Sequence, residues 1–259
     1  MSNNISINND KKIICFLSSM HPYDDKRVFE KEARSLNDNG FHVIHIAPGD
    51  GSEFLHKNIS IKTFKKNGSS IIRRMTGLIG LYKFAKSINA DAYHCNEIDS
   101  WFVGLLLKFS LKSKCVFDVH EHYPEEFAEV RFHKSIRFIV IFFVRLLIRL
   151  LCQYTDRIVI AKSSLKDEFK FLKDHQVVLV QNFSPIKNFD NISNLNDLKY
   201  TQEKFKIIHL GLFGIARGWK EVMDAMIRLN DINLELTILG KINDGSEDEF
   251  LSFIDNNNL

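Results

Sequence analysis

The chain has 259 residues and a net charge of only +3, from 35 Lys and Arg against 32 Asp and Glu. A charge this small gives no overall basic surface, so we expect no nucleic-acid partner. With 45% hydrophobic residues the chain can bury the core of one large domain or of two smaller ones. The polar N-terminus MSNNISINND lacks the profile of a signal peptide, and the sequence therefore predicts a cytoplasmic protein.

Short runs rich in β-branched residues alternate with longer amphipathic segments over the first 182 residues. Strands are predicted at 12–19, 42–48, 91–97, 115–121, 157–162 and 177–182, with a further candidate at 60–64. Helices are predicted at 26–38, 69–88, 98–111, 125–154 and 164–173. This alternation is typical of βαβ units, and it predicts that residues 1–182 form a complete α/β, Rossmann-like domain with helices on both faces of a parallel sheet.

The composition changes after Asn182, where residues 183–202 are polar, rich in Asn and interrupted by a proline. This segment is predicted to be a linker. The alternation then resumes with strands at 206–213 and 234–240 and helices at 219–229 and 247–255. A domain of this type needs roughly 100 residues, so we expect residues 203–259 to be the first part of a second Rossmann-like domain.

The segment CVFDVHEHYPEEF, residues 115–127, places titratable side chains directly after a predicted buried strand. Ligands of open α/β sheets bind at the carboxyl edge of parallel strands, so this segment is a candidate site. Asp118 and His120 alternate along the strand and are expected on one face. A structural capping role for His120 is the alternative.

A second candidate site is the loop in HLGLFGIARGWKE, where a strand leads through glycines into a helix. The loop brings together Gly211, Gly214, Arg217, Gly218 and Lys220. Glycines let the backbone approach phosphate, a helix N-terminus favours anions, and a guanidinium can bind two phosphate oxygens at once. The loop is therefore predicted to bind phosphate, with an ordinary turn and a solvated arginine as the alternative.

Five separated segments occur in the order and spacing of a known enzyme family: SSMHPYDDKRVFEKEARSLNDNGFHVIHIAP, DAYHCNE, FDVHEHYPEEF, VQNFSP and GLFGIARGWKEVMDAM. Over residues 12–240 the chain resembles the family 4 glycosyltransferases of the GT-B fold, and within them bacterial enzymes of surface-polysaccharide synthesis. The resemblance implies that 1–182 binds mainly the acceptor, a lipid-linked molecule or an oligosaccharide. It implies that 203–259 binds mainly the nucleotide-sugar, and that the sugar is transferred with retention at the anomeric carbon.

The same resemblance assigns roles to residues. His120 is the candidate catalytic residue, near the donor sugar, and Arg217 stands where many family members have the phosphate-binding lysine of a Lys-Gly pair. His21 and Arg27 match the family pattern at the cleft edge, where they can touch acceptor or diphosphate. The candidate substrate-binding residues are His21, Arg27, Asn96, Glu97 and Glu121. At Asn96 and Glu97 family members often have His-Asp instead, which leaves the role of these two in doubt.

The sequence gives little support for a metal site or for reactive cysteines. Glu121 and His122 beside His120 raise a zinc site as an alternative, but the other Cys and His residues lack matching spacing. The chain also has no Asp-x-Asp motif of a metal-dependent GT-A transferase. We expect no metal and no cofactor besides the nucleotide-sugar. The four cysteines form no C-x-x-C pair and are predicted to be reduced core residues: Cys15, Cys95, Cys115 and Cys152.

Residues 131–152 combine basic and apolar side chains. On a helix, five basic residues fall within about a third of the wheel: Arg131, Lys134, Arg137, Arg145 and Arg149. The longest uncharged run is far below the roughly 18 residues that span a bilayer. The pattern suits a helix in the interface of an anionic membrane, which predicts peripheral binding at the inner face of the plasma membrane. The alternative is a buried domain helix whose arginines reach solvent at one edge.

A second functional hypothesis is a truncated or split, non-catalytic chain that needs a partner segment. Family 4 enzymes hold the donor sugar and ribose with two glutamates separated by a fixed spacing. The one such spacing here, Glu121 and Glu129, lies in the first domain. We therefore expect little or no transferase activity from the chain alone. A sugar-nucleotide epimerase of similar fold is a further alternative that no motif supports.

Overall fold

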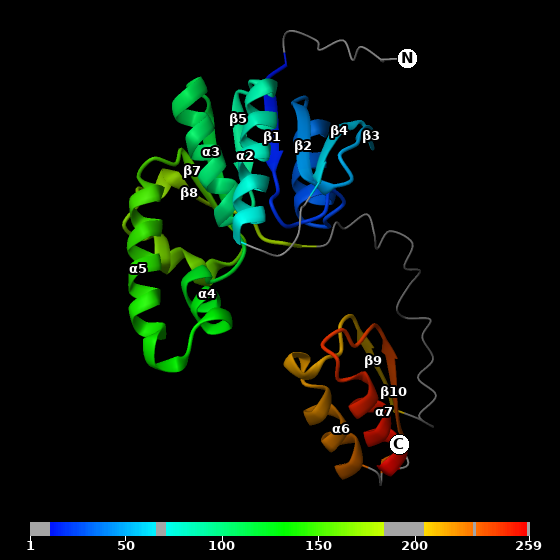
Figure 1. Cartoon of the computed structure of the whole chain (residues 1–259). Helices are drawn as coiled ribbons and strands as arrows, with labels where there is room; N and C mark the ends of the chain where they lie inside the picture. Colours follow the sequence, from blue (N-terminus) through cyan, green and yellow to red (C-terminus); the bar gives the residue numbers. More distant parts are fainter. Residues whose placement is uncertain (1–10, 66–70, 184–204, 230–231, 258–259) are drawn as a thin grey trace. The chain divides into compact units, whose positions relative to one another are not determined.

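The chain divides into two compact units, residues 1–184 and residues 185–259. The structure is a computed structural model that describes residues 11–65, 71–183, 205–229 and 232–257 (Figure 1). The predicted linker 183–202 lies outside the described residues apart from Phe183. Each unit is therefore considered by itself.

The first unit is built on an eight-stranded sheet in the order β3-β4-β2-β1-β5-β6-β7-β8. The strands are β1 (Ile13–Leu17), β2 (His42–Gly49), β3 (Glu53–His56), β4 (Ile59–Lys65), β5 (Ala92–Cys95), β6 (Lys114–Val119), β7 (Arg157–Ile160) and β8 (Val177–Leu179). Neighbouring strands are parallel except β3, which pairs antiparallel with β4. The predicted α/β class with a mostly parallel sheet is confirmed.

Strand β3 is the strand that the sequence did not predict. It joins β4 through Lys57 and Asn58, which have positive φ values of 48° and 66°. Two residues of positive φ form the tight turn that matches the twist of a hairpin. The usual signal for such a turn is Asn-Gly or Asp-Gly, and the pair Lys57-Asn58 is neither.

Helical segments cover both faces of this sheet (Figure 1). They are η1 (Val28–Ala33), which continues as α1 (Arg34–Asp38), α2 (Ile71–Ile88), α3 (Ile98–Leu111), α4 (Tyr123–Arg131), α5 (Lys134–Cys152), η2 (Ser163–Phe169) and η3 (Asp174–Gln176). The alternation of side chains along β1 separates two cores. Cys15 and Leu17 pack in one cluster with Trp101 of α3, whereas Phe16 packs with Phe29 of η1 in the other.

Two helix predictions were wrong. Residues 125–154 were expected to form one helix, but α4 and α5 are separated by Phe132 and His133, which are extended. Arg137 of α5 donates from Nε to the carbonyl of Phe132 at 3.0 Å and from Nη2 to that of Glu129 at 2.9 Å. These bonds satisfy carbonyls at the end of α4 and stabilise the break. The predicted helix 164–173 is a 3-10 segment, η2.

The second unit has two parallel strands, β9 (Phe205–Leu210) and β10 (Leu234–Leu239), and two main helices, α6 (Trp219–Arg228) and α7 (Glu247–Asn257). A short 3-10 segment, η6 (Ile215–Arg217), precedes α6. Trp219 and Phe250 lie in its core, and Nε1 of Trp219 donates to Oγ of Ser246 at 3.0 Å. Several apolar side chains of β9 are exposed, including Phe205 and Leu210.

The four cysteines are buried with free thiols, as predicted. In the ranges that the structure describes, no helix has the length and apolar character needed to cross a membrane.

Gly104 of α3 tests how closely this helix approaches the sheet. A Cβ at this position would lie 2.3 Å from Sγ of Cys95 and 3.1 Å from Sγ of Cys115. We expect Gly104→Ala to lower the free energy of unfolding by about 1–3 kcal/mol, the usual cost of overpacking a core. Urea denaturation followed by circular dichroism measures the effect.

The matched control is Gly80→Ala in α2, where an added Cβ meets no atom within 4 Å. Alanine favours a helix by up to about 1 kcal/mol over glycine, so this variant should be neutral or more stable. Equal stability of the two variants would contradict the close packing of α3.

Candidate active site

The candidate site lies where three adjacent strands end at the same edge of the first sheet. β1, β5 and β6 are neighbours and parallel, so the segments after them meet. These segments carry His21 after β1, Asn96 and Glu97 after β5, and His120 after β6. The topology thus brings together most of the residues that the sequence singles out in the first domain.

Glu97 and Asn96 shape the loop after β1. Oε2 of Glu97 accepts from the backbone amide of Ser19 at 2.9 Å, and Oε1 accepts from the amides of Met20 and His21 at 3.1 Å each. Nδ2 of Asn96 donates to Oγ of Ser18 at 3.0 Å. Both side chains are buried. They hold the loop that carries His21, and this is a structural role that the sequence did not predict for them.

His21 is partly accessible, with 40% of its side chain exposed. Its ring centroid lies 6.1 Å from that of His120. Nδ1 of His21 is 3.7 Å from a carboxylate oxygen of Asp25. Asp25 also accepts from the backbone amides of Arg27 and Val28 at 2.8 and 2.9 Å, and so begins η1. The backbone on both sides of His21 is therefore fixed.

Arg27 is buried in an ionic cluster. Its Nη2 lies 3.0 Å from Oδ1 of Asp118 and 2.9 Å from Oε1 of Glu32. Its Nε and Nη1 donate to Oδ2 of Asp118 and to the carbonyl of Val180 at 3.4 and 3.2 Å. Only 7% of the residue is exposed. In this structure the guanidinium predicted to touch acceptor or diphosphate binds groups of the protein itself.

His94 of β5 completes the cluster and carries a positive charge at neutral pH. Its Nε2 lies 3.3 Å from Glu32 and 3.9 Å from Asp118, and its ring stacks on Phe16. Burial lowers the pKa of His94, but the nearby carboxylates of Asp118 and Glu32 outweigh burial and raise the pKa to about 9. Sequence reasoning missed Glu32 and His94. The one available signal was a histidine within a buried strand.

The carboxylate of Asp118 stays ionised although it is fully buried. Burial alone would raise its pKa, but hydrogen bonds with His120 and His94 and their charges hold the pKa well below its usual range. Oδ2 of Asp118 is 2.5 Å from Nε2 of His120. The expected proximity of Asp118 and His120 is thus present, and 17% of the His120 side chain is exposed.

Glu121 and His122 turn away from this cluster. Nζ of Lys162 donates to Oε2 of Glu121 at 2.5 Å, and Nδ1 of His122 bonds a carboxylate oxygen of Glu168. The residues of the zinc alternative therefore bind separate partners on the segment after β7. Glu121 remains a predicted substrate-binding residue that is exposed beside a lysine.

Three side chains, two of them buried and Glu32 partly buried, have the composition of a metal site, with one oxygen or nitrogen atom of each within 4.8 Å of the others: Glu32, His94 and Asp118. In this cluster the Arg27 guanidinium bonds both carboxylates, and protonated His94 adds a second positive charge. The guanidinium of Arg27 thus supplies positive charge to both carboxylates of this cluster.

The glycine-containing loop of the second unit lies between β9 and α6. Gly211 and Gly218 have φ values of +122° and +80°, which side chains rarely adopt. A Cβ on Gly214 would lie 2.3 Å from Oδ2 of Asp244, which accepts from the backbone amide of Ile215 at 2.6 Å. These glycines are thus required by the local backbone and packing, whether or not phosphate binds.

The two cations of this loop differ. Arg217 is exposed at the end of η6. Nζ of Lys220 instead lies 2.5 Å from Oε1 of Glu249 and 5.4 Å from the ring centroid of Trp219. Arg217 is therefore the predicted phosphate-binding side chain with the freer access.

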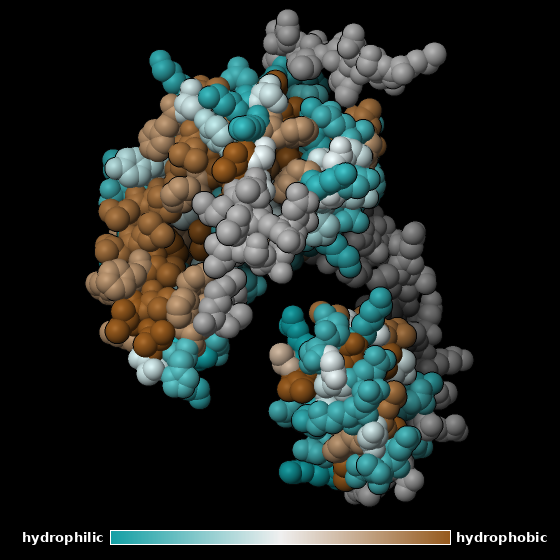
Figure 2. Space-filling model, viewed as in Figure 1, coloured by the Kyte–Doolittle hydropathy of each residue, from teal (hydrophilic) through white to brown (hydrophobic). Residues whose placement is uncertain are grey.

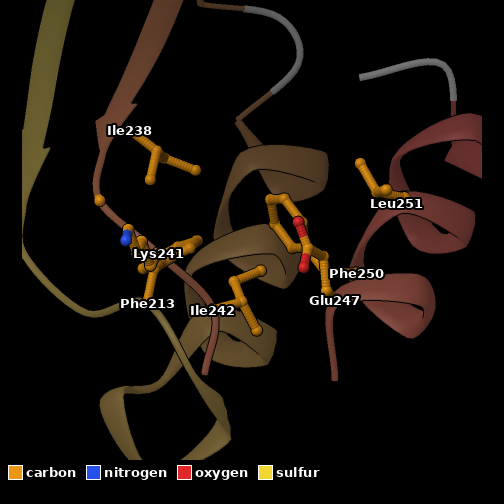
Figure 3. Close-up of a pocket in the computed structure, with 8 residues that line it drawn as sticks. Phe213, Ile238, Lys241, Ile242, Glu247, Phe250 and Leu251 are labelled. Carbon is orange, nitrogen blue, oxygen red and sulfur yellow. The ribbon is translucent and has the colours of Figure 1, made fainter. Parts of the chain in front are cut away.

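A cavity of about 460 Å³ opens beside this loop in the second unit (Figure 3). Its apolar lining residues include Phe213 from the loop, Ile238 from β10 and Phe250 from α7. Lys241 and Glu247 supply its charged groups. Phe213 is the residue of the loop that lines this cavity, and Arg217 is not part of the lining.

Solved structures identify the class of protein to which this fold belongs. The chain is similar to sucrose-phosphate synthase from Thermosynechococcus elongatus, with 12% identity, a TM-score of 0.66 and coverage of 96% of this chain and 68% of the other. It is similar to Anabaena HepE in complex with UDP and glucose, with 12% identity, a TM-score of 0.63 and coverage of 96% and 67%. It is also similar to a glycosyltransferase from Rickettsia africae, with 13% identity, a TM-score of 0.63 and coverage of 96% of this chain and 66% of the other. The fold is thus that of GT-B proteins, of which the chain spans about two thirds.

The family follows from the sequence itself. The family model for Glycosyltransferase Family 4 matches residues 26–185, which is more than half of the chain. The chain belongs to glycosyltransferase family 4. No curated protein sequence matches it.

The pKa of His94 makes the stability of the first unit depend on pH. Because this pKa is about 9 in the folded chain and about 6.5 for an ordinary histidine, the imidazolium stabilises the fold fully below pH 6.5. This contribution is lost as the pH rises through about 9. We expect the free energy of unfolding to fall by up to about 3 kcal/mol between pH 6.5 and 9.5.

Urea denaturation at a series of pH values measures this dependence. In His94→Gln the same interval should show a much smaller change, because no group titrates at that position. A wild-type chain that is equally stable at pH 6.5 and 9.5, or a variant with the wild-type pH dependence, would contradict a charged His94.

Proposed function

We propose that the chain transfers a sugar from a nucleotide-sugar to a lipid-linked or oligosaccharide acceptor, with retention, in the synthesis of a surface polysaccharide. The observation that carries this proposal is family membership together with the edge formed by His21 and His120. An imidazole can hydrogen-bond a sugar hydroxyl, and both rings are partly exposed at this edge. In this proposal residues 1–182 bind mainly the acceptor and residues 203–259 bind mainly the donor.

Departure of a nucleoside diphosphate requires positive charge and N–H groups near its oxygens. Arg217 offers an exposed guanidinium beside the glycine-containing loop and the start of α6. A nucleotide-sugar donor is supported by HepE, which was also solved with UDP-glucose and has 14% identity and a TM-score of 0.62. UDP-glucose is therefore the first donor to test.

Permeabilised cells that normally make the chain provide the test, because any partner of the chain is then present. Labelled nucleotide-sugars are supplied to wild-type cells and to cells that lack the chain, and label in lipid and polysaccharide is measured. We expect incorporation from one donor to disappear without the chain and to return on complementation. Incorporation that is unchanged for every nucleotide-sugar would contradict the proposal.

The purified chain decides between this function and the second hypothesis, a non-catalytic chain that needs a partner segment. The second hypothesis is supported by the exposed apolar residues of β9, which a partner segment would cover. Sugar transfer by the purified chain would exclude it. Transfer in cells together with none by the purified chain would support it.

The cell assay also tests Arg217 and His120. Removing one preorganised electrostatic contact costs about 2–4 kcal/mol of transition-state stabilisation. We expect Arg217→Ala to lower the incorporation rate at limiting donor about 30- to 1,000-fold, and His120→Ala to lower turnover while the fold survives. Arg228→Ala is the matched control, because Arg228 is an exposed arginine in the last turn of α6, at the end away from the loop. Unchanged incorporation in Arg217→Ala would remove Arg217 from the site.

We propose in addition that the chain binds an anionic membrane at the inner face of the plasma membrane through α5. The apolar side of this helix is exposed, and Cys152 is its one buried residue. Figure 2 shows a continuous hydrophobic surface over α5 and α3. Its exposed apolar residues are Ile136, Phe138, Ile139, Phe142, Phe143, Leu146, Leu147 and Leu150 on α5 and Phe102, Leu106 and Phe109 on α3. We call these residues the α3–α5 face.

Charge favours lipid as the occupant of the α3–α5 face. α5 contains no acidic residue, and Lys134, Arg145 and Arg149 lie along one border of its apolar side. Arg145 pairs with Glu125, and Arg149 lies over the ring of Phe171. The exposed apolar side of α5 supports this proposal over the alternative of a buried helix with solvated arginines. A basic border beside an exposed apolar face suits anionic headgroups above acyl chains.

Vesicle sedimentation tests this surface. We expect the chain to sediment with vesicles that contain anionic phosphatidylglycerol more than with neutral vesicles, and to be released as salt rises, because charge is screened over about 8 Å at physiological ionic strength. The double variant Phe142→Ala and Phe143→Ala should bind at least about tenfold less tightly.

The matched control for the vesicles is Phe205→Ala, a similarly exposed phenylalanine on β9. It should bind like the wild type. Equal binding to neutral and anionic vesicles would count against the basic border, and absence of binding to both would indicate that the α3–α5 face contacts protein.

A further inference from the structure

The fully buried carboxylate of Asp118 links a guanidinium to the imidazole of His120. Its Oδ1 accepts from Nη2 of Arg27 at 3.0 Å, and its Oδ2 lies 2.5 Å from Nε2 of His120. Arg27 comes from the start of η1 and the other two residues from the end of β6, so the link joins segments 91 positions apart. Asp118 therefore holds the ring of His120, and Asp118 is itself held by Arg27 at the start of η1.

The charge of Asp118 determines which nitrogen of His120 carries the proton. An ionised carboxylate can only accept hydrogen bonds, so the atom that faces it must be a donor. In the neutral imidazole one nitrogen is a donor and the other an acceptor. An unprotonated Nε2 would place a lone pair against the carboxylate at 2.5 Å, which is repulsive. Nε2 is therefore the protonated nitrogen.

The other nitrogen of His120 is free for a ligand. Within residues 11–65, 71–183, 205–229 and 232–257, no side chain or backbone group bonds Nδ1 of His120. The ring has some exposure and lies near the ring of His21, which is more exposed. In the neutral Nε2–H form, Nδ1 accepts a hydrogen bond, and sugar hydroxyls are donors of the matching kind.

We infer that Asp118, held by Arg27, is a positioning residue that fixes His120 as the Nε2–H tautomer and leaves Nδ1 as the acceptor for a hydroxyl of the bound sugar. The identity of the ligand rests on the proposed function. The tautomer is a property of the free protein and can be measured without any ligand. The role of Asp118 is thus separable from sugar transfer.

The first experiment measures the tautomer in the full chain. The protein is labelled with ¹⁵N-histidine, and two-bond proton–nitrogen correlation spectra are recorded at a pH where His120 is neutral. His120→Gln identifies the His120 signals by their loss. We expect Nε2 of His120 to have the shift of a protonated nitrogen and Nδ1 that of an unprotonated one. A protonated Nδ1, or an equal mixture of the two forms, would overturn the inference whether or not the chain transfers sugar.

The second experiment compares two isosteric amide variants. In Asp118→Asn the amide can either accept or donate, so the His120 signals should shift toward a mixture of tautomers. Glu32→Gln is the matched control, because Glu32 bonds Arg27 at 2.9 Å and no contact with His120 is present. This control should keep the wild-type tautomer. Wild-type signals in Asp118→Asn would show that another group fixes the ring.

The cell assay then connects the tautomer to sugar transfer. We expect Asp118→Asn to lower turnover about 10- to 100-fold, as is usual on loss of a group that orients an active residue, and Glu32→Gln to lower it less than about threefold. Wild-type turnover in Asp118→Asn, with an altered tautomer, would overturn the ligand contact at Nδ1. The expected tautomer without any sugar transfer would reject the proposed function and keep the positioning by Asp118.

Discussion

The ion pair between Arg27 and Asp118 is the contact on which the functional edge of the first sheet depends. Both side chains are removed from water, and a buried charge that loses its partner costs several kcal/mol. The pair also gathers Glu32, His94 and the carbonyl of Val180, so that η1, β5, β6 and the segment after β8 are joined at one end of the sheet. Because these contacts join residues from four segments, the cluster constrains where the loops after the strands can lie.

The polar residues at this edge divide by exposure. Arg27, Asn96, Glu97 and Asp118 are buried, and their donors and acceptors mainly bond one another or the backbone. His21 and His120 keep part of their surface accessible above them. The buried polar residues hold the two imidazoles in place. Less conformational entropy is then lost when a polyhydroxyl ligand binds, which favours binding. Charged residues in these sequence motifs are therefore not all available to a substrate, because several of them are buried and bond other groups of the protein.

The α3–α5 face has the reverse organisation. Here the arginines bond groups of the protein or lie at the border, while phenylalanine and leucine side chains meet solvent. An exposed apolar surface of this extent is costly in water and marks a surface that is covered in use. In the proposed function, the edge with His21 and His120 binds sugar and the α3–α5 face binds lipid.

The sequence by itself determined the α/β class, the order of most elements and the loops that carry the site. These follow from local periodicity and from the rule that parallel strands end at one edge, which brought His21, Asn96 and His120 together without coordinates.

Only the tertiary structure decided which of these side chains remain accessible. The pairing of Arg27 with Asp118 spans 91 positions, and the charge of His94 depends on Glu32 and Asp118 from other elements. The break before α5 is stabilised by hydrogen bonds from Arg137 to carbonyls at the end of α4. The exposure of the apolar side of α5 also depends on the tertiary structure, because it depends on which elements pack against this helix. Long-range contacts of this kind leave no periodic trace in the chain, because they depend on which elements the fold places side by side.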